Sequence, residues 1–475
     1  MSNIKIETST QKIAADLYTP VGIYLRMRDK FRDTILLEST DSHAGENSKS
    51  IIGINAIGGI EISSLTKAEY KYPLQATTNI ALNNKSDVSA ILGGFLNSFE
   101  VVGDDDKNTS IAQGLFGYTN YDAVQFFENI SFNATTKINA TDIPLLRYRL
   151  YQYVIVINHF KDEIYLCENK IDGLESNIKQ IEHILKSKDV PEFPFAMVGN
   201  EGSDITNEDY ITMVQKGIAA CKRGDVFQIV LSRSFYQKYT GDDFNVYRTL
   251  RSINPGPYLF YFDYGDYKLM GSSPESQVII DNQQVIVHPI AGTFKRTGND
   301  EADKKLAIAL ENDPKENAEH TMLVDLARND LSTICKNVTV TQLKAINYYS
   351  HVIHMVSEVQ GTISTEHNPF KIMGAVFPAG TLSGAPKFKA MQLINAIEAS
   401  QRNFYGGAIG YIGFDKSCNH AIMIRSMLCK NNTLHYRAGA GVVAASNPQL
   451  ELEEVNHKLG ALKNAIIQAQ NKVSF

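Results

Sequence analysis

Two acidic segments of the chain carry the residue types that bind a hard divalent cation. Glu316 and Glu319 lie three residues apart in the first segment, and Glu451 and Glu454 repeat this spacing in the second. Residues three apart share one face of an α-helix. In proteins, Mg²⁺ takes one or two carboxylates and fills its remaining positions with water and substrate oxygens. If the two helices converge, the four carboxylates can hold Mg²⁺ against an anionic substrate.

Helix capping explains the same residues without a metal. Asp313 followed by Pro314 is typical of a helix start, and Glu316 then falls where an acidic side chain completes a capping box. Glu454 can pair with Lys458 one turn later. Acidic residues also suit helix N-termini in general. Spacing alone does not show that the helices meet, so both interpretations stay open at this point.

The elements that must position these residues follow from the apolar patterns. Alternating or continuous apolar runs predict strands over 34–38, 51–54, 60–65, 147–157, 226–232, 258–264 and 268–271. Helical spacing predicts helices over 171–187, 209–222 and 449–469. The polar segment 188–207 is punctuated by Pro and Gly, which favours a boundary. We therefore expect an N-terminal region over 1–187, a linker over 188–207 and a C-terminal domain over 208–475.

Composition excludes several classes of protein. The 475 residues are 43% apolar and 21% charged, which is typical of a chain with a sizeable core. A net charge of −6 argues against nucleic acid or an anionic membrane as the main partner. No apolar run has the length of a membrane span, and the N-terminus is no signal peptide. The five cysteines form no C-x-x-C pair, so we predict a reducing, cytoplasmic environment.

Six motifs then occur in a characteristic order along the C-terminal domain. They are VFQIVLSR at 226–233, GSSPE at 271–275, HPIAGT at 288–293, KENAEH with LVDLARND within 315–330, FPAGTLSGAPK at 377–387 and AGAG at 438–441. Over roughly 210–466 the chain resembles the chorismate-binding domain of anthranilate synthase component I. The resemblance implies an α+β fold with two packed β-sheets flanked by helices and the active site in the cleft. The N-terminal region matches mainly through LLES at 36–39, with NPGPY at 254–258 as its counterpart.

The resemblance also assigns roles to individual residues. It implies that Glu319 and Glu454 bind Mg²⁺ directly, with Glu316 and Glu451 in support through water. Arg425 would grip a carboxylate of chorismate, because a guanidinium binds carboxylates with two parallel hydrogen bonds. The other implied substrate contacts are Tyr405, Gly292, Thr293, Thr381, Gly439, Gly441 and Lys458.

The implied chemistry needs an acid and a base. Ammonia adds at C2 of chorismate as the C4 hydroxyl leaves, and pyruvate is then lost as the ring becomes aromatic. Glu275 matches the acid that protonates the hydroxyl, and His354 matches the base that removes the ring proton. Gln228 and Thr293 complete the implied catalytic set. A positioned acid or base typically contributes roughly 10²–10⁴-fold to a rate.

Two positions discriminate between members of the family. Ala291 stands where aminodeoxychorismate synthases usually carry a nucleophilic lysine, and Gln228 stands where water-using isochorismate and salicylate synthases carry a lysine base. Both residues favour anthranilate synthase. Aminodeoxychorismate synthase is the first alternative, opposed by Ala291. A catalytically silent, tryptophan-binding regulatory subunit is the second, opposed by the retained acid, base and metal ligands. Phe294, Asn447 and Gln449 depart from the usual family pattern.

The resemblance further implies a partner and an inhibitor. We find no glutamine amidotransferase module in the sequence, so a separate amidotransferase subunit is expected to deliver ammonia within a hetero-oligomer. Glu38 is expected to attract the ammonium group of tryptophan, and Ser39 to hold the pocket closed; a strand followed by an ordinary Asn-Pro turn is the alternative. The full set of residues implied for tryptophan is Glu38, Ser39, Lys49, Pro257, Tyr258, Leu259 and Tyr411. The absence of tryptophan from the chain is compatible with a role in tryptophan synthesis.

Overall fold

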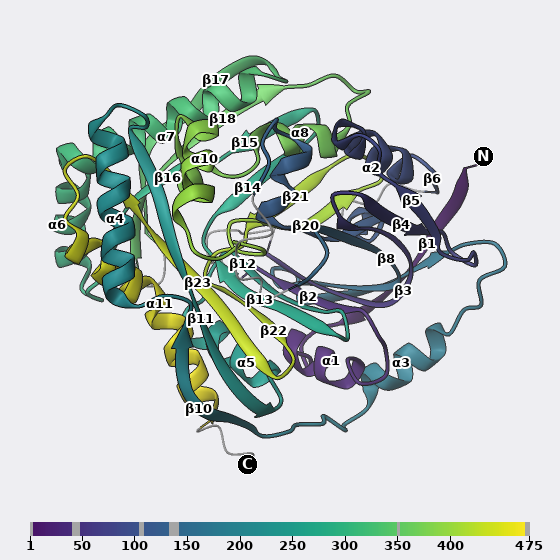
Figure 1. Ribbon diagram of the computed structural model, residues 1–475. Coiled ribbons are helices and arrows are strands. Elements are labelled where there is room, and N and C mark those ends of the chain that lie inside the picture. The colour runs from purple at the N-terminus through teal and green to yellow at the C-terminus, as the bar shows by residue number, and fades with distance from the viewer. Residues whose placement is uncertain (1–2, 40–47, 104–108, 133–141, 349–351, 471–475) are drawn as a thin grey trace.

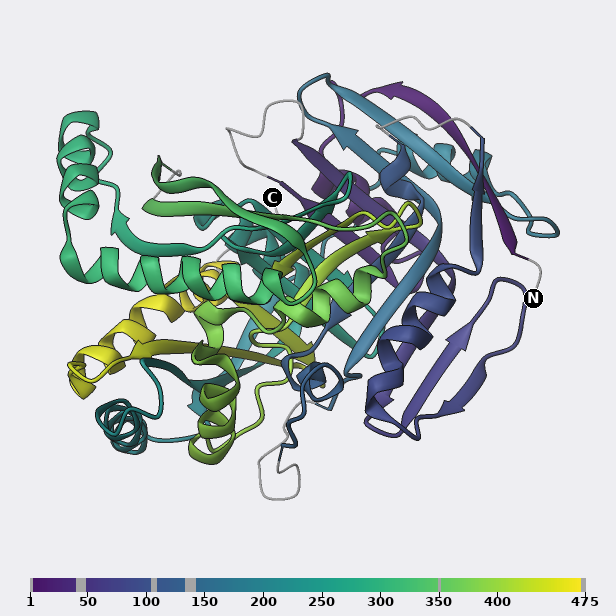
Figure 2. The same cartoon turned by 90° about the horizontal axis from the view of Figure 1, so that it is seen from above.

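The computed structural model describes residues 3–39, 48–103, 109–132, 142–348 and 352–470 (Figure 1). The strands form two extended arrays, and helices lie on the outer faces of both arrays (Figure 2). Neighbouring strands run antiparallel, apart from the parallel pair at the N-terminal edge. The expected α+β class is confirmed.

The first array runs through both halves of the sequence. Its order is β6–β1–β9–β8–β3–β2–β12–β13–β22–β23–β11–β10. The bounds are β1 Ile4–Ala14, β2 Thr34–Glu38, β3 Lys49–Ser64, β6 Phe99–Val102, β8 Leu146–Asn158, β9 Glu163–Lys170, β10 Phe195–Ser203, β11 Gln228–Gly241, β12 Tyr258–Asp263, β13 Tyr267–Ser273, β22 Ser426–Lys430 and β23 Thr433–Val442. The short β19 (Gly384–Ala385) also pairs with the start of β11.

The second array branches from β8 and continues into the C-terminal half. Its order is β8–β7–β20–β21–β14–β15–β18, and both β16 and β17 also pair with β18. The bounds are β7 Gly114–Thr119, β14 Ser276–Asp281, β15 Gln284–Val287, β16 Ile290–Lys295, β17 Lys336–Tyr348, β18 Val352–Thr362, β20 Ala408–Gly413 and β21 Cys418–Ile422. A small edge of β4 (Lys67–Lys71) and β5 (Thr78–Ala81) extends from β3.

The two arrays pack against each other through a shared apolar core. Phe260 and Phe262 of β12 lie in this core together with Phe116 of β7. Leu259 and Tyr261 alternate with them and face the opposite core, which lies under the helices. Successive strand residues point to opposite faces, so a strand covered on both sides reads as a continuous apolar run. This explains the sequence YLFYF and confirms the expected pair of packed sheets.

Helices cover the outer faces. The first array carries α1 (Pro20–Met27), α3 (Ile178–Lys186), α4 (Asn207–Lys222), α5 (Phe244–Ile253), α10 (Lys387–Ile397) and α11 (Pro448–Gln470). The second carries α2 (Val88–Leu96), α7 (Pro314–Ser332) and α8 (Pro369–Val376), and α6 (Asp300–Glu311) packs on β16 and β18. Within the described ranges, no helix is long and apolar enough to cross a membrane. The five cysteines form no disulfide.

Two predicted segments differ from the structure. The helix expected over 171–187 begins only at Ile178, because the chain first turns at Gly173, whose φ is +79°. The segment 188–207, expected as a linker, contains strand β10, which pairs with β11 and joins the sheet. Strands also pair across this segment, β2 with β12 and β7 with β20. The division into an N-terminal region and a C-terminal domain stays a prediction.

Candidate active site

Helix α7 presents its acidic residues away from its own N-terminal cap. Asp313 Oδ1 accepts the backbone N–H groups of Lys315 at 2.8 Å and Glu316 at 3.0 Å. Asp313 therefore caps the helix by itself and leaves the Glu316 side chain for other contacts. A methyl group built on Gly292 would lie 3.2 Å from Glu316 Oε2, so this carboxylate lies directly beside β16.

Helix α11 brings the second pair of glutamates to the same place. The pKa of Glu316 is raised by burial and by its neighbours Glu319 and Glu454. The pKa of Glu451 is also raised by burial and by Glu454, while Lys315 of α7 acts in the opposite direction. On each helix, a carboxylate therefore has a pKa that responds to a charge on the other helix, which supports convergence of the two helices. Spacing in the sequence could not show this convergence.

These carboxylates suit a hard cation chemically, but the side chains are turned to other partners. Among the described residues, no three acidic, histidine or cysteine side chains lie close enough together to hold an ion as they stand. Glu319 Oε1 accepts a hydrogen bond from Gln228 Nε2 at 2.8 Å. Glu454 Oε1 pairs with Lys458 Nζ at 2.7 Å, and both side chains are about half exposed. Carboxylate oxygens are ligands that Mg²⁺ takes, and Glu319 and Glu454 would have to exchange these partners for the ion.

Two glycines of β23 lie beside this part of the site. At Gly441, which pairs with Val230, an added methyl group would lie only 2.6 Å from Gln228 Nε2. A larger residue would therefore displace the amide that bonds to Glu319. The carbonyl of Gly439 accepts a hydrogen bond from Lys458 Nζ at 3.0 Å.

Glu275 has the properties of a proton donor. It lies between β13 and β14, is buried, and accepts a hydrogen bond from Thr381 Oγ1 at 3.0 Å. Burial raises the pKa of Glu275 to about 8, against the opposing effects of Thr381, Arg425 and Lys458. A carboxyl with this pKa carries its proton at neutral pH, as a general acid requires.

Arg425 lies near Glu275, and its guanidinium charge can bind an anionic group. Its backbone has a φ of +48°, and its carbonyl accepts the N–H of Ser272 at 3.1 Å. Burial lowers the pKa of Arg425, yet a guanidinium stays charged in proteins. Among the described residues, Glu275 is the acidic group that acts on this pKa, and it is protonated at neutral pH. The guanidinium can therefore receive a carboxylate from a ligand.

Tyr405 lies near the same end of the site. It is buried and packs with Leu382, the neighbour of Thr381. Burial raises the pKa of its hydroxyl, so this group is neutral and can donate a hydrogen bond. The role of Tyr405 as a hydroxyl partner for a ligand carboxylate stays a prediction.

His354 has the properties of a base. It lies in β18 opposite Thr293, whose side chain is outside the described part of the structure. Burial lowers the pKa of His354 to about 4, so the ring is neutral at neutral pH. Its Nδ1 lies 3.1 Å from the carbonyl of Gly292. Because a carbonyl only accepts, Nδ1 must carry the proton, so the lone pair of the neutral ring is on Nε2.

A cavity adjoins the Glu275 side chain. Its lining includes Glu275, Thr381, His288, Leu326 and Asp330. Asp330 forms an ion pair with Lys387 at 2.5 Å, at the end of the FPAGTLSGAPK segment. Most of the exposed lining of the cavity is apolar, in keeping with the burial that raises the pKa of Glu275.

The residues expected to bind tryptophan lie around the edge of the central core. Glu38 pairs with Leu259 across β2 and β12, and Pro257 immediately precedes β12. Tyr258 and Tyr411 pack against the core between the sheets. The backbone N–H of Ser39 donates to the carbonyl of Lys49 at 3.2 Å.

The carboxylate of Glu38 already has strong partners. It is buried and accepts hydrogen bonds from Tyr247 at 2.7 Å and from Arg251 Nε at 2.8 Å. These contacts fix β2 to α5. A ligand ammonium group would have to compete with Arg251 for this carboxylate.

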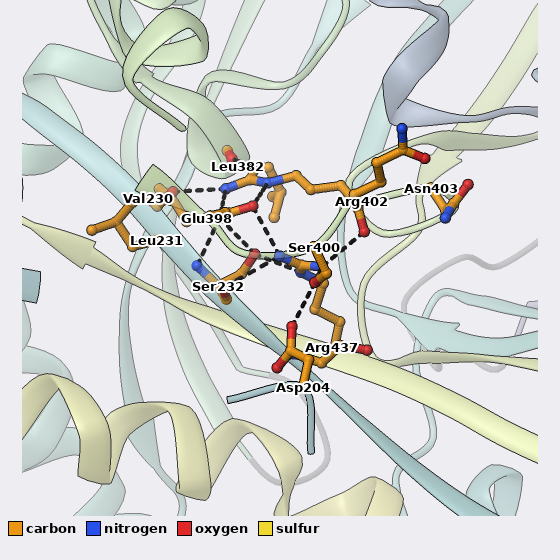
Figure 3. Close-up of polar contacts among 12 residues, drawn as sticks. Asp204, Val230, Leu231, Ser232, Leu382, Glu398, Ser400, Arg402, Asn403 and Arg437 are labelled. Atoms are coloured by element: carbon orange, nitrogen blue, oxygen red, sulfur yellow. Dashed lines mark hydrogen bonds and ion pairs between the residues drawn. The ribbon is translucent and has the colours of Figure 1, made fainter. Parts of the chain in front are cut away.

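The sequence analysis missed one buried charged cluster beside the site. Glu398 and Arg402 lie close to Arg437, which comes much later in the chain (Figure 3). Their side chains are 1–3% exposed. No spacing rule links a residue at the end of one helix to a strand residue 39 positions later, so the sequence carried no signal for this cluster.

Comparison with known proteins shows the family to which the chain belongs. The family model for chorismate binding enzymes matches residues 62–464. Anthranilate synthase component 1 from Acetivibrio thermocellus is 34% identical over 97% of this chain and 95% of its own length. The protein of the same name from Thermus thermophilus is 33% identical over 98% and 99%, respectively.

Solved structures give the same result. The crystal structure of anthranilate synthase component I from Streptococcus pneumoniae superposes with a TM-score of 0.75 at 29% identity, covering 95% of this chain and 99% of that one. A menaquinone-specific isochorismate synthase from Escherichia coli shares the fold, with a TM-score of 0.71 at 15% identity over 98% and 96% of the two chains. The chain belongs to the chorismate binding enzyme family, and its similarity to the anthranilate synthase component 1 proteins extends over nearly its whole length.

Proposed function

We propose that this chain is the large subunit of an anthranilate synthase, which converts chorismate and ammonia to anthranilate and pyruvate. One observation carries the proposal. A buried carboxyl that keeps its proton, Glu275, and a buried imidazole that is neutral, His354, belong to a site where Arg425 can receive a carboxylate. An acid, a base and an anion-binding group are what the two steps of this reaction require.

In the first step, the ring of chorismate gains ammonia at C2 and loses the hydroxyl at C4 as water. Glu275 donates the proton that the leaving hydroxyl needs, and Thr381 holds its carboxyl in place. In the second step, Nε2 of His354 takes the ring proton as the bond between the ring and the enolpyruvyl oxygen breaks. The ring becomes aromatic, and the released enolpyruvate takes up a proton to become pyruvate. Arg425 and Tyr405 orient the substrate through its carboxylate.

Mg²⁺ is part of the proposal, with Glu319 and Glu454 as direct ligands and Glu316 and Glu451 acting through water. When bound, the ion neutralises a second carboxylate of chorismate. The convergence of α7 and α11 supports this assignment. Burial and then the neighbouring carboxylate of Glu319 raise the pKa of Glu316, and a bound cation would offset both effects.

Two residues favour ammonia over the other nucleophiles of the family. Ala291 is buried in β16 and offers no nucleophilic group. The Gln228 amide donates to Glu319, and an amide cannot take a proton from water. Ammonia needs no such base, because its neutral form is already a nucleophile. Aminodeoxychorismate synthesis and a silent regulatory role remain the alternatives that the product assay decides.

The proposal includes a partner and a regulator. The relatives are named component 1, which supports a second component that supplies ammonia from glutamine. Tryptophan, the end product of the pathway that anthranilate enters, is proposed to inhibit the enzyme at the edge formed by β2 and β12. We place the protein in the cytoplasm.

The experiment uses the purified chain with chorismate, Mg²⁺ and an ammonium salt at alkaline pH. Anthranilate fluorescence should rise with time for the wild type. Glu275→Gln should be inactive while keeping the wild-type circular dichroism spectrum. Absence of anthranilate from the folded wild-type protein would reject the proposal.

A further inference from the structure

A single buried guanidinium connects three segments that surround the proposed site. Arg402 Nη1 donates to the carbonyl of Leu382 at 2.5 Å, and Nη2 donates to the carbonyl of Val230 at 2.7 Å (Figure 3). The Arg402 guanidinium also lies 4.7 Å from the ring centre of Tyr121 and 5.9 Å from that of Tyr405. Its side chain is 2% exposed, so water does not share these contacts.

Each carbonyl belongs to a segment with a separate task. Leu382 directly follows Thr381, which donates to Glu275. Val230 lies two residues after Gln228, which donates to Glu319. Arg402 therefore joins the segment that holds the acid to the strand that holds a proposed metal ligand.

Glu398 fixes the orientation of this guanidinium. Its two carboxylate oxygens accept from Arg402 Nε at 3.0 Å and Nη2 at 2.6 Å, which sets the plane of the group. The same carboxylate accepts from Arg437 at 2.9 Å and from the Ser232 N–H and hydroxyl at 2.9 and 2.8 Å. Burial acts to raise the pKa of Glu398, but Arg402 and Arg437 hold it at about 2. The carboxylate stays charged and the anchor stays intact at neutral pH.

Burying three charges is costly, and an apolar cluster of the same size is often equally stable. Stability alone therefore gives a weak reason for this cluster. Its hydrogen bonds go to the backbone beside the proposed acid and metal ligand, which is where a small displacement reduces a rate most.

We infer that Arg402 is a positioning residue that holds Thr381 and Gln228 in register through the carbonyls of Leu382 and Val230. This inference rests on the proposed function for its catalytic meaning, but its structural content can be measured without turnover. Lysine at this position would keep the positive charge. It would lose the planar fork that reaches Glu398 and both carbonyls at once.

The measurement is the pKa of Glu275, followed by ¹³C NMR of glutamate side-chain carboxyls. Glu275→Gln assigns the resonance by its disappearance. The hydrogen bond from Thr381 lowers this pKa, as do the charges of Arg425 and Lys458, which also face the carboxyl. If Arg402→Lys displaces Thr381, the pKa of Glu275 should rise by about one unit, the size expected for a lost hydrogen bond to a charged group.

A double-mutant cycle separates positioning from a general loosening of the fold. Thr381→Val should raise the pKa of Glu275 by itself. Adding Arg402→Lys to Thr381→Val should then change it little, because both variants remove the same hydrogen bond. The matched control is Arg28→Lys, since Arg28 is another buried arginine, paired with Asp242 at 2.6 Å. It should lower the melting temperature without moving the pKa of Glu275.

Kinetics provide a second readout. Arg402→Lys should lower kcat for anthranilate formation about tenfold or more, with a smaller rise in KM for chorismate, because Thr381 is also an expected substrate contact. An unchanged pKa of Glu275 in folded Arg402→Lys would overturn the inference, as would additive shifts in the cycle.

If Arg402→Lys does not fold, Glu398→Gln replaces it. This variant weakens the anchor but keeps the guanidinium, and the same shift in the pKa of Glu275 is measured. If Arg402→Lys shifts the pKa of Glu275 but the wild-type chain makes no anthranilate, the proposed function is rejected and the positioning role is kept.

Discussion

Gln228 Nε2 donates to Glu319 Oε1 at 2.8 Å, which joins the start of β11 to α7. The amide provides a hydrogen bond to the Glu319 carboxylate, and a bound cation would replace this hydrogen bond. The contact therefore links a residue that discriminates between chorismate enzymes to a proposed metal ligand. It also explains why an added methyl group at Gly441 would disturb the site, since that group would meet the same amide.

The first prediction concerns the metal. Glu319→Gln and Glu454→Gln should abolish Mg²⁺-dependent turnover, because each removes one direct ligand from an ion that takes few protein carboxylates. The matched control is Glu453→Gln, an exposed neighbour on α11 that should keep activity. Activity is measured against Mg²⁺ concentration, and Mg²⁺ binding by calorimetry. Full turnover of either ligand variant after thorough chelation would refute the metal assignment.

The second prediction concerns the pH dependence of Glu275. Its proton is present below a pKa of about 8, so kcat/KM at constant free ammonia should fall as the pH rises through that value. Between about pH 4.5 and pH 8 the carboxyl is protonated in the folded chain and ionised in the unfolded chain, so raising the pH in this window favours unfolding. At pH 7 this costs on the order of 3 kcal/mol of stability.

Glu275→Gln should therefore be more stable than the wild type at pH 7 and equally stable near pH 4, while being inactive at both. Denaturant unfolding at the two pH values measures the difference. Equal stability at both values would show that burial does not suppress the ionisation of Glu275.

Family motifs in the sequence named candidate site residues, whereas much of their surroundings carried no such signal. Glu275 and His354 were assigned from motifs, and their burial and protonation states fit the assigned roles. Strand β12 was also predicted, because burial on both faces leaves a continuous apolar run. The convergence of α7 and α11 depends on tertiary packing, which spacing within either helix does not encode. The pairing of β10 with β11 was missed because β10 is mostly exposed and polar.

The third prediction concerns the nitrogen source. The isolated chain should use ammonium but not glutamine, because a separate subunit is proposed to supply ammonia from glutamine. Adding a glutamine amidotransferase subunit should restore glutamine-dependent turnover, measured by anthranilate fluorescence at neutral pH, where little free ammonia is present. Strong glutamine-dependent activity of the purified chain alone would contradict the expected division between subunits.

The fourth prediction concerns feedback inhibition. Ser39 follows β2 and is bound through its backbone to Lys49, so Ser39→Phe should crowd the proposed tryptophan pocket and weaken inhibition. Uninhibited turnover should be kept, because tryptophan acts only through its preference for one state. Ser63→Phe, at an exposed position late in β3, is the control. Inhibition curves at fixed chorismate decide this, and identical curves for Ser39→Phe and the wild type would remove the proposed pocket.

The central claim is that this site joins ammonia to chorismate and releases pyruvate. The most direct measurement supplies chorismate, Mg²⁺ and ¹⁵N-labelled ammonium to the wild-type chain and analyses the products by chromatography and mass spectrometry. The account predicts ¹⁵N-labelled anthranilate and an equimolar amount of pyruvate, with no accumulation of isochorismate or 4-amino-4-deoxychorismate. A dominant 4-amino product, isochorismate, or unchanged chorismate would contradict it.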